Sequence, residues 1–190
     1  TVIAVRKYMK DRATLTMFVL LCSAATALPA VTVKIDANGA SLENRHIERV
    51  LGTAAGRLVT KTITNKRAGT EAAPVQCDEF RLRISRGTDT TGTDVLLTGA
   101  DFAVRDVAPY TPKSGNGAKG VAARLFCAAH GIAVTACYEL APGDFYLRKF
   151  LKIATDKATT LERIDVEAMR FEDASQPYTI KCIHARGKWS

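Results

Sequence analysis

Apolar residues recur at every second position in many short segments of this chain, and this pattern limits the fold more than any other feature. In one such segment Phe80, Leu82 and Ile84 alternate with Arg81 and Arg83. Side chains of a β-strand point to its two faces in turn, so this period places the apolar side chains on one face. No segment carries a long helical period. The sequence therefore predicts a chain built of strands.

Turn-forming residues separate these segments at intervals of about 8–12 residues, a spacing typical of β-sandwiches. Turns are expected at Asn38-Gly39 and at Pro142-Gly143-Asp144, and the longest loop is expected over residues 109–120. After a first strand through Val31, Val33 and Ile35, the expected strands are 45–51, 57–64, 79–85, 95–98, 102–107, 121–128, 132–140, 145–154, 161–169 and 178–185. The predicted fold class is all-β, an antiparallel β-sandwich.

Residues 9–27 have the order of a secretory signal peptide. A short basic stretch starts at Met9, an apolar run covers 15–21, and Ala25-Thr26-Ala27 fits a cleavage site. The apolar run is shorter than the roughly 20 residues of a membrane span. A buried core helix is the alternative, and bulky Leu21 argues against lipidation of Cys22. The expected division is an upstream extension and signal helix over 1–30 and a sandwich domain over 31–190, in a secreted or periplasmic protein.

Charge and cysteine content exclude several classes of function. The net charge is +8, of which residues 1–30 carry +3, so the predicted domain carries +5. This charge is spread along the chain without basic runs or interleaved aromatics, so no nucleic-acid partner is expected. The spacing C-x-x-C does not occur, so neither a metal site nor a cofactor is expected. Export permits disulfides, but buried free thiols are an equally good interpretation for the cysteines of the domain: Cys77, Cys127, Cys137 and Cys182.

No pair of acidic residues has the spacing of a catalytic pair. Glu139 and Asp144 flank a turn, while Asp165 and Glu167 are expected on one strand face, and solvated surface charge is the simpler interpretation of all four. Arg148 and Lys149 are expected on an outward charged face. The histidines, which a sugar epimerase would need beside a glutamate, are far apart in the sequence: His46, His130 and His184.

Tyrosine and tryptophan side chains could stack on sugar rings. Core packing is the simpler role for most of them. Tyr110, placed by the pattern in the loop rich in proline and glycine, is the best exposed candidate, and Trp189 near the end of the sequence is the second. We therefore expect any carbohydrate contact at Tyr110 and Trp189, and no catalytic residue in the sandwich.

Four phrases resemble a known family: Glu79-Phe80-Arg81-Leu82-Arg83-Ile84, Leu97-Thr98-Gly99-Ala100-Asp101-Phe102, residues 134–153 (VTACYELAPGDFYLRKFLKI), and Leu161-Glu162-Arg163-Ile164-Asp165-Val166. They are similar to the N-terminal β-sandwich of melibiase-type α-galactosidases and related large glycoside hydrolases. The sequence departs from this pattern at residues 154–157, where an Asn-centred turn is more usual. The resemblance implies a galactose-mutarotase-like supersandwich that precedes a catalytic (β/α)₈ barrel located after Ser190, so that the sandwich is truncated before its barrel.

The resemblance implies a non-catalytic accessory domain of an exported glycoside hydrolase, with the downstream barrel and carbohydrate as partners. A freestanding carbohydrate-binding sandwich is the alternative, and a mutarotase-like epimerase is a third. Within the domain, residues 121–140 are expected to form a hairpin that turns at His130-Gly131. A three-residue loop would set Cys127 opposite Ala133 and Cys137 opposite Ala123, so that the two cysteines do not bridge.

Overall fold

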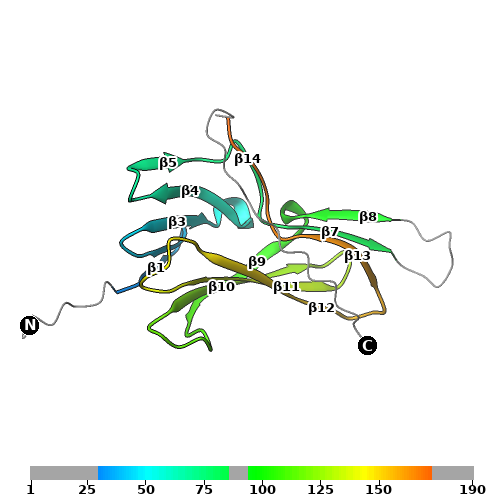
Figure 1. Ribbon diagram of the computed structural model, residues 1–190. Coiled ribbons are helices and arrows are strands. Elements are labelled where there is room, and N and C mark those ends of the chain that lie inside the picture. The colour runs from blue at the N-terminus through cyan, green and yellow to red at the C-terminus, as the bar shows by residue number, and fades with distance from the viewer. Residues whose placement is uncertain (1–29, 86–93, 173–190) are drawn as a thin grey trace, which may run out of the picture.

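The computed structural model describes residues 30–85 and 94–172, and Figure 1 shows their arrangement. The regular structure in this part of the chain consists of strands and two short 3₁₀ helices, η1 (Ala54–Gly56) and η2 (Gly99–Asp101). No helix among these residues is long and apolar enough to span a membrane. The predicted signal segment, the predicted strand over 178–185, Trp189, His184 and Cys182 lie outside the described residues.

The first half of the chain forms a five-stranded antiparallel meander in the order β1-β2-β3-β4-β5. Its strands are β1 (Thr32–Asp36), β2 (Gly39–Glu43), β3 (Ile47–Gly52), β4 (Val59–Asn65) and β5 (Thr70–Ala72). The turn expected at Asn38-Gly39 is the β1–β2 hairpin, in which Asp36 pairs with Gly39. Gly39 has φ 147°, and a Cβ there would lie 2.0 Å from the carbonyl oxygen of Leu51. Only glycine fits at this position.

A four-stranded antiparallel sheet follows in the order β12-β11-β10-β9. Its strands are β9 (Ala103–Tyr110), β10 (Lys119–Cys127), β11 (Ile132–Leu140) and β12 (Arg148–Thr155). The predicted β10–β11 hairpin is confirmed, and Gly131 takes the left-handed conformation with φ 61°. The predicted register is wrong by one residue, because the connection has four residues rather than three. Cys127 lies opposite Ile132, and Cys137 opposite Ala122.

Two smaller antiparallel sheets complete the described part of the chain, one in the order β13-β7-β8 and one formed by β14 and β6. Their strands are β6 (Gln76–Asp78), β7 (Arg81–Ser85), β8 (Val95–Thr98), β13 (Thr160–Asp165) and β14 (Ala168–Arg170). The alternation expected in β7 is confirmed, because Leu82 and Ile84 are 0% exposed while Arg83 on the opposite face is exposed. The single strand expected over 161–169 is two strands, β13 and β14.

One apolar core joins the three larger sheets, with the four-stranded sheet lying below the other two in Figure 1. The five-stranded sheet contributes Leu42 and Leu51, the three-stranded sheet Leu82, and the four-stranded sheet Val121 and Val134, all buried. Facing antiparallel sheets that share a core make a β-sandwich, so the predicted fold class is confirmed.

Candidate functional site

The core of the sandwich contains a buried charged cluster centred on Glu79, which lies between β6 and β7. The Glu79 side chain is 0% exposed. Around it lie Arg49 of β3, Thr60 of β4, Tyr138 of β11 and Lys149 of β12. Arg49 and Tyr138 point inward because each shares the face of its strand with buried apolar residues. The cluster therefore connects the sheets through polar contacts.

The hydrogen bonds of this cluster use both carboxylate oxygens of Glu79. Oε2 accepts from Arg49 Nη2 at 3.0 Å, from Lys149 Nζ at 2.7 Å and from the Tyr138 hydroxyl at 2.5 Å. Oε1 accepts from the Thr60 hydroxyl at 2.5 Å. A second carboxylate, Glu167, pairs with Arg49 and lies 3.4 Å from Lys149 Nζ. Two cations therefore balance two carboxylates, as buried charges require.

The protonation states within the cluster follow from this charge balance. Burial opposes ionisation of Glu79, but the charges of Lys149 and Arg49 outweigh it and hold the pKa of the carboxyl well below its usual range. Burial and the Glu79 charge raise the pKa of the Tyr138 hydroxyl, which stays a neutral donor. The same two causes raise the pKa of the Cys77 thiol to about 12. The Glu79 carboxyl is therefore ionised and the Tyr138 hydroxyl neutral near neutral pH, while burial lowers the pKa of the Lys149 amine.

The structure places two members of this cluster, Lys149 and Glu167, differently from what the sequence predicts. Lys149 was expected on an outward charged face with Arg148, yet its side chain is 5% exposed and lies in the core. Asp165 and Glu167 do not act as a pair, because Asp165 accepts from Arg163 at 2.8 Å while Glu167 joins the cluster. A signal for Lys149 was present in the sequence, since it shares the period of Leu147, Leu151 and Ile153.

Tyr110 lies on the outer face of the four-stranded sheet, where it ends β9 instead of lying in the predicted loop. The register places Tyr110 opposite Gly120, Gly120 opposite Glu139, and Glu139 opposite Arg148. Directly opposed residues of a sheet share a face, so these residues form one row across the sheet. We call this row, together with Tyr146, the outer-face row.

The half-buried Tyr110 ring is held in place by contacts on two sides. A Cβ at Gly120 would lie 2.5 Å from the ring, so the absence of a side chain at Gly120 allows the ring to lie there. The Tyr110 hydroxyl donates to Glu139 Oε1 at 2.9 Å, and burial, aided by this bond, raises the pKa of the hydroxyl. Glu139 and Asp144, which flank the turn, therefore have different partners, and Asp144 lies 3.6 Å from Arg148 Nη2.

Two exposed aromatic side chains lie beside the other end of this row, in the loop between β11 and β12. Tyr146 is 48% exposed, with the Arg148 guanidinium 5.5 Å from its ring centroid, and its hydroxyl accepts from Arg148 Nη2 at 3.0 Å. Phe145 is 69% exposed and meets the His46 ring edge-on at 5.8 Å. The strand expected over 145–154 would place Phe145 on the same face as Leu147, which packs against the core. Phe145 lies before β12 begins, so it does not take part in the alternation of that strand.

Asn44, a buried polar residue between β2 and β3, holds this aromatic loop. Its side-chain amide donates to the carbonyl oxygens of Ala141 at 2.9 Å and of Asp144 at 2.7 Å. Its side-chain oxygen accepts from the backbone N–H groups of His46 and Ile47. One side chain thus connects two loops that are about a hundred residues apart in sequence. Sequence reasoning missed Asn44, because a single Asn beside a strand is indistinguishable from an ordinary turn residue.

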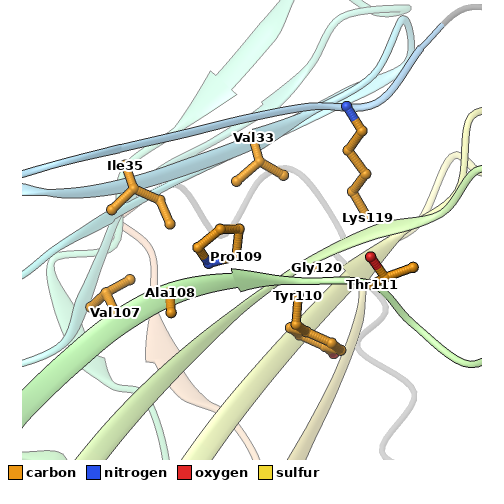
Figure 2. A pocket seen from close by; sticks show the side chains of 9 residues that line it. All are labelled: Val33, Ile35, Val107, Ala108, Pro109, Tyr110, Thr111, Lys119 and Gly120. Carbon is orange, nitrogen blue, oxygen red and sulfur yellow. The ribbon is translucent and has the colours of Figure 1, made fainter.

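A groove of about 560 Å³ lies between the two edge strands β1 and β9. Figure 2 shows Val33 and Ile35 of β1 facing Val107 and Pro109 of β9, with Lys119 at one end and Tyr110 on the opposite side of β9 from Pro109. The facing side chains are apolar and uncharged except at Lys119, so the groove offers few groups for polar recognition or catalysis.

The remaining candidates do not come together in the part of the chain that the structure describes. His46 contacts Phe145, while His130 lies in the β10–β11 connection. Within residues 30–85 and 94–172, no group of three histidine, cysteine or acidic side chains is placed to hold a metal ion. Cys77, Cys127 and Cys137 are free thiols.

Comparison with known proteins adds no assignment. No protein-family model matches this sequence, and no curated protein matches it significantly.

Proposed function

We propose that this chain is a non-catalytic accessory domain of an exported glycoside hydrolase, which packs on a downstream (β/α)₈ barrel and helps to shape its substrate cleft. The all-β sandwich is the architecture that this role requires. The resemblance of residues 134–153 and 161–166 to the N-terminal sandwich of melibiase-type α-galactosidases supplies the link to glycoside hydrolysis. Export follows from the signal-like order of residues 9–27.

The observation that carries the proposal is the aromatic loop held by Asn44. Exposed Phe145 and Tyr146 are adjacent on a loop whose backbone is fixed at Ala141 and Asp144 by a buried amide. A fixed loop cannot collapse to bury its aromatic side chains, so their apolar surface remains available to a partner. Such an arrangement supports a contact surface at this end of the sandwich.

The carboxylates described above support recognition rather than bond cleavage. Glycoside hydrolysis uses two facing carboxyl groups, one of which must carry a proton in the acid step. Glu79 is ionised and enclosed by its partners, and Glu139 accepts from Tyr110. Assigning the acid and the nucleophile to a following barrel is therefore the simpler account.

A freestanding carbohydrate-binding sandwich is the second candidate, and one observation favours it. The outer-face row combines half-exposed Tyr146 with the charged side chains of Glu139 and Arg148. These are groups that hold a sugar without cleaving it. The two roles differ in whether the encoding reading frame continues into a barrel.

The test uses the complete protein encoded by the gene, with Phe145→Asp as the variant. If the loop packs on the barrel, this charge should lower the thermal midpoint of the complete protein and its glycosidase activity. Leu96→Asp on β8, at a side chain 53% exposed, is the matched control and should change neither. A reading frame that ends without a barrel, or equal behaviour of the two variants, would reject packing through this loop.

A further inference from the structure

We propose that the outer-face row, formed by Tyr110, Glu139, Arg148 and Tyr146 around Gly120, binds a neutral sugar ring. This inference rests on the carbohydrate-binding role given above as the second candidate, and deepens it by naming the groups that contact the sugar and the charge of the ligand. It also differs from the prediction that Tyr110, in an exposed loop, and Trp189 make the carbohydrate contact. Tyr110 here orients Glu139, while Tyr146 and the two charged groups offer the contacts.

The row brings together the two kinds of group that sugar recognition needs. The C–H face of a pyranose ring packs on an aromatic ring, and Tyr146 is 48% exposed beside the row. The hydroxyl groups of the sugar need donors and acceptors in fixed positions. Glu139 and Arg148 are opposed residues on adjacent strands β11 and β12, a spacing that lets both reach one ligand.

Both charged groups keep hydrogen-bonding capacity beyond their contacts within the row. Glu139 Oε1 accepts from Tyr110 at 2.9 Å, and a carboxylate has about four lone-pair sites. Arg148 Nη2 donates to Tyr146 at 3.0 Å and pairs with Asp144 at 3.6 Å, and a guanidinium has about five N–H groups. An acceptor and a donor therefore remain for two neighbouring hydroxyls of a sugar.

Charge at the row favours a neutral ligand over an anionic one. Arg148 is accompanied by two carboxylates, Glu139 opposite it and Asp144 at 3.6 Å. An incoming phosphate or uronate would meet one cation and two anions, so the local field opposes its binding. A polyol presents no net charge and can use the same carboxylates as acceptors.

The row is also fixed before any ligand binds. Gly120 gives the Tyr110 ring its place, Tyr110 orients Glu139, and Arg148 lies against the Tyr146 ring. Asn44 fixes the loop that carries Tyr146 through the carbonyl oxygens of Ala141 and Asp144. Side chains that become ordered only on binding weaken the affinity for the ligand. Most side chains of the row are already ordered in the folded chain, so this cost is small.

The inference is tested by affinity electrophoresis of the 190-residue chain through native gels that contain galactomannan, arabinoxylan or mixed-linkage β-glucan. We expect retardation by at least one of these neutral polysaccharides. Tyr146→Ala and Glu139→Gln should each weaken the apparent affinity by about fivefold or more. Arg124→Gln, on the same sheet face but nearer the other end of its strands, and Leu96→Ala on β8 should leave it unchanged.

Two further measurements keep the result decisive. Gels containing polygalacturonate should retard Tyr146→Ala and the wild-type chain equally, since simple charge attraction does not need the tyrosine. If Glu139→Gln lowers the urea midpoint, Tyr146→Ala decides the question, because Tyr146 lies in the loop outside the core. Migration of the wild-type chain unaffected by all three neutral polysaccharides, or retardation that persists unchanged in Tyr146→Ala, overturns the inference, whatever the activity of a following barrel.

Discussion

Lys149 Nζ lies 2.7 Å from Glu79 Oε2 inside the sandwich, although 70 residues separate the two in the sequence. The same amine donates to the backbone carbonyl oxygen of Glu79 at 2.5 Å. These bonds connect β12 of the four-stranded sheet to the short connection between β6 and β7. Because Arg49 of β3 reaches the same carboxylate, one acidic side chain joins the five-stranded and the four-stranded sheets.

Replacing Glu79 by Gln should lower the free energy of unfolding by about 3–5 kcal/mol, since it leaves Arg49 and Lys149 buried with only Glu167 to balance them. Urea denaturation followed by circular dichroism measures this change. Glu162→Gln, at an exposed side chain bonded to Ser85, is the control and should stay within about 0.5 kcal/mol of the wild-type chain. A small effect of Glu79→Gln would mean that the cluster contributes little to stability.

The stability of the wild-type chain and that of Glu79→Gln should respond differently to acid. The pKa of Glu79 in the folded chain is lower than in the unfolded chain, where it is about 4.3. Its contribution to stability is therefore full above that value and is lost as the pH falls toward the folded-state pKa. Urea midpoints measured from pH 7 to pH 2.5 should show the gap between wild type and Glu79→Gln narrowing below about pH 4. A gap that stays constant over this range would contradict an ionised Glu79.

Cysteine pairing tests the register of the β10–β11 hairpin. Cys137 lies opposite Ala122, whereas Ala123 points to the opposite face of β10. Mild oxidation of Ala122→Cys should therefore link the introduced thiol to Cys137, and oxidation of Ala123→Cys should not. Peptide mapping without reduction distinguishes the two, and in the wild-type chain it should recover no Cys127–Cys137 disulfide. A link to Cys137 formed only by Ala123→Cys would shift the register by one residue.

Much of this fold could be predicted from the sequence because strand alternation is a local signal. The limits predicted for β11 and β8 agree with the structure, and the faces of β7 were predicted residue by residue. The short strands β5 and β6 were missed, since three residues are too few to show a period. The hairpin register was one residue off, because the prediction took the connection length from the turn residues and not from the alternation. Opposed residues share a face, so only a connection with an even number of residues places Leu125 and Val134 together in the core.

The polar sites were harder to predict because they depend on contacts between distant residues. Lys149 has the period of a core residue, but a lysine on an apolar face is recognised as buried only once Glu79 is known to lie opposite it. Glu79 and Arg49 are 30 residues apart, and no local pattern pairs them. Tyr110 was predicted to lie in a loop that starts at residue 109, but β9 continues through Tyr110, so the contact of its hydroxyl with Glu139 was not foreseen.

Glycine positions offer a test of the first hairpin. Gly39→Ala should lower stability by more than about 2 kcal/mol, because its new Cβ would lie 2.0 Å from the carbonyl oxygen of Leu51, at a φ of 147°. Gly143→Ala, where a Cβ would have no neighbour within 4 Å, should change stability by less than about 0.5 kcal/mol. Thermal denaturation of the two variants in parallel checks this. Equal thermal midpoints of the two variants would contradict the close approach of residue 39 to Leu51 at the β1–β2 turn.

The central claim is that this sandwich binds carbohydrate and does not hydrolyse glycosides. The most direct test is to measure glycosidase turnover by the purified 190-residue chain. Aryl α-galactosides and a panel of other aryl glycosides should remain unhydrolysed, while the complete encoded protein should hydrolyse at least one of them. The opposite result is equally specific. Turnover by the chain itself, abolished by Glu139→Gln or Asp165→Asn, would place the catalytic carboxylates in the sandwich and contradict the account.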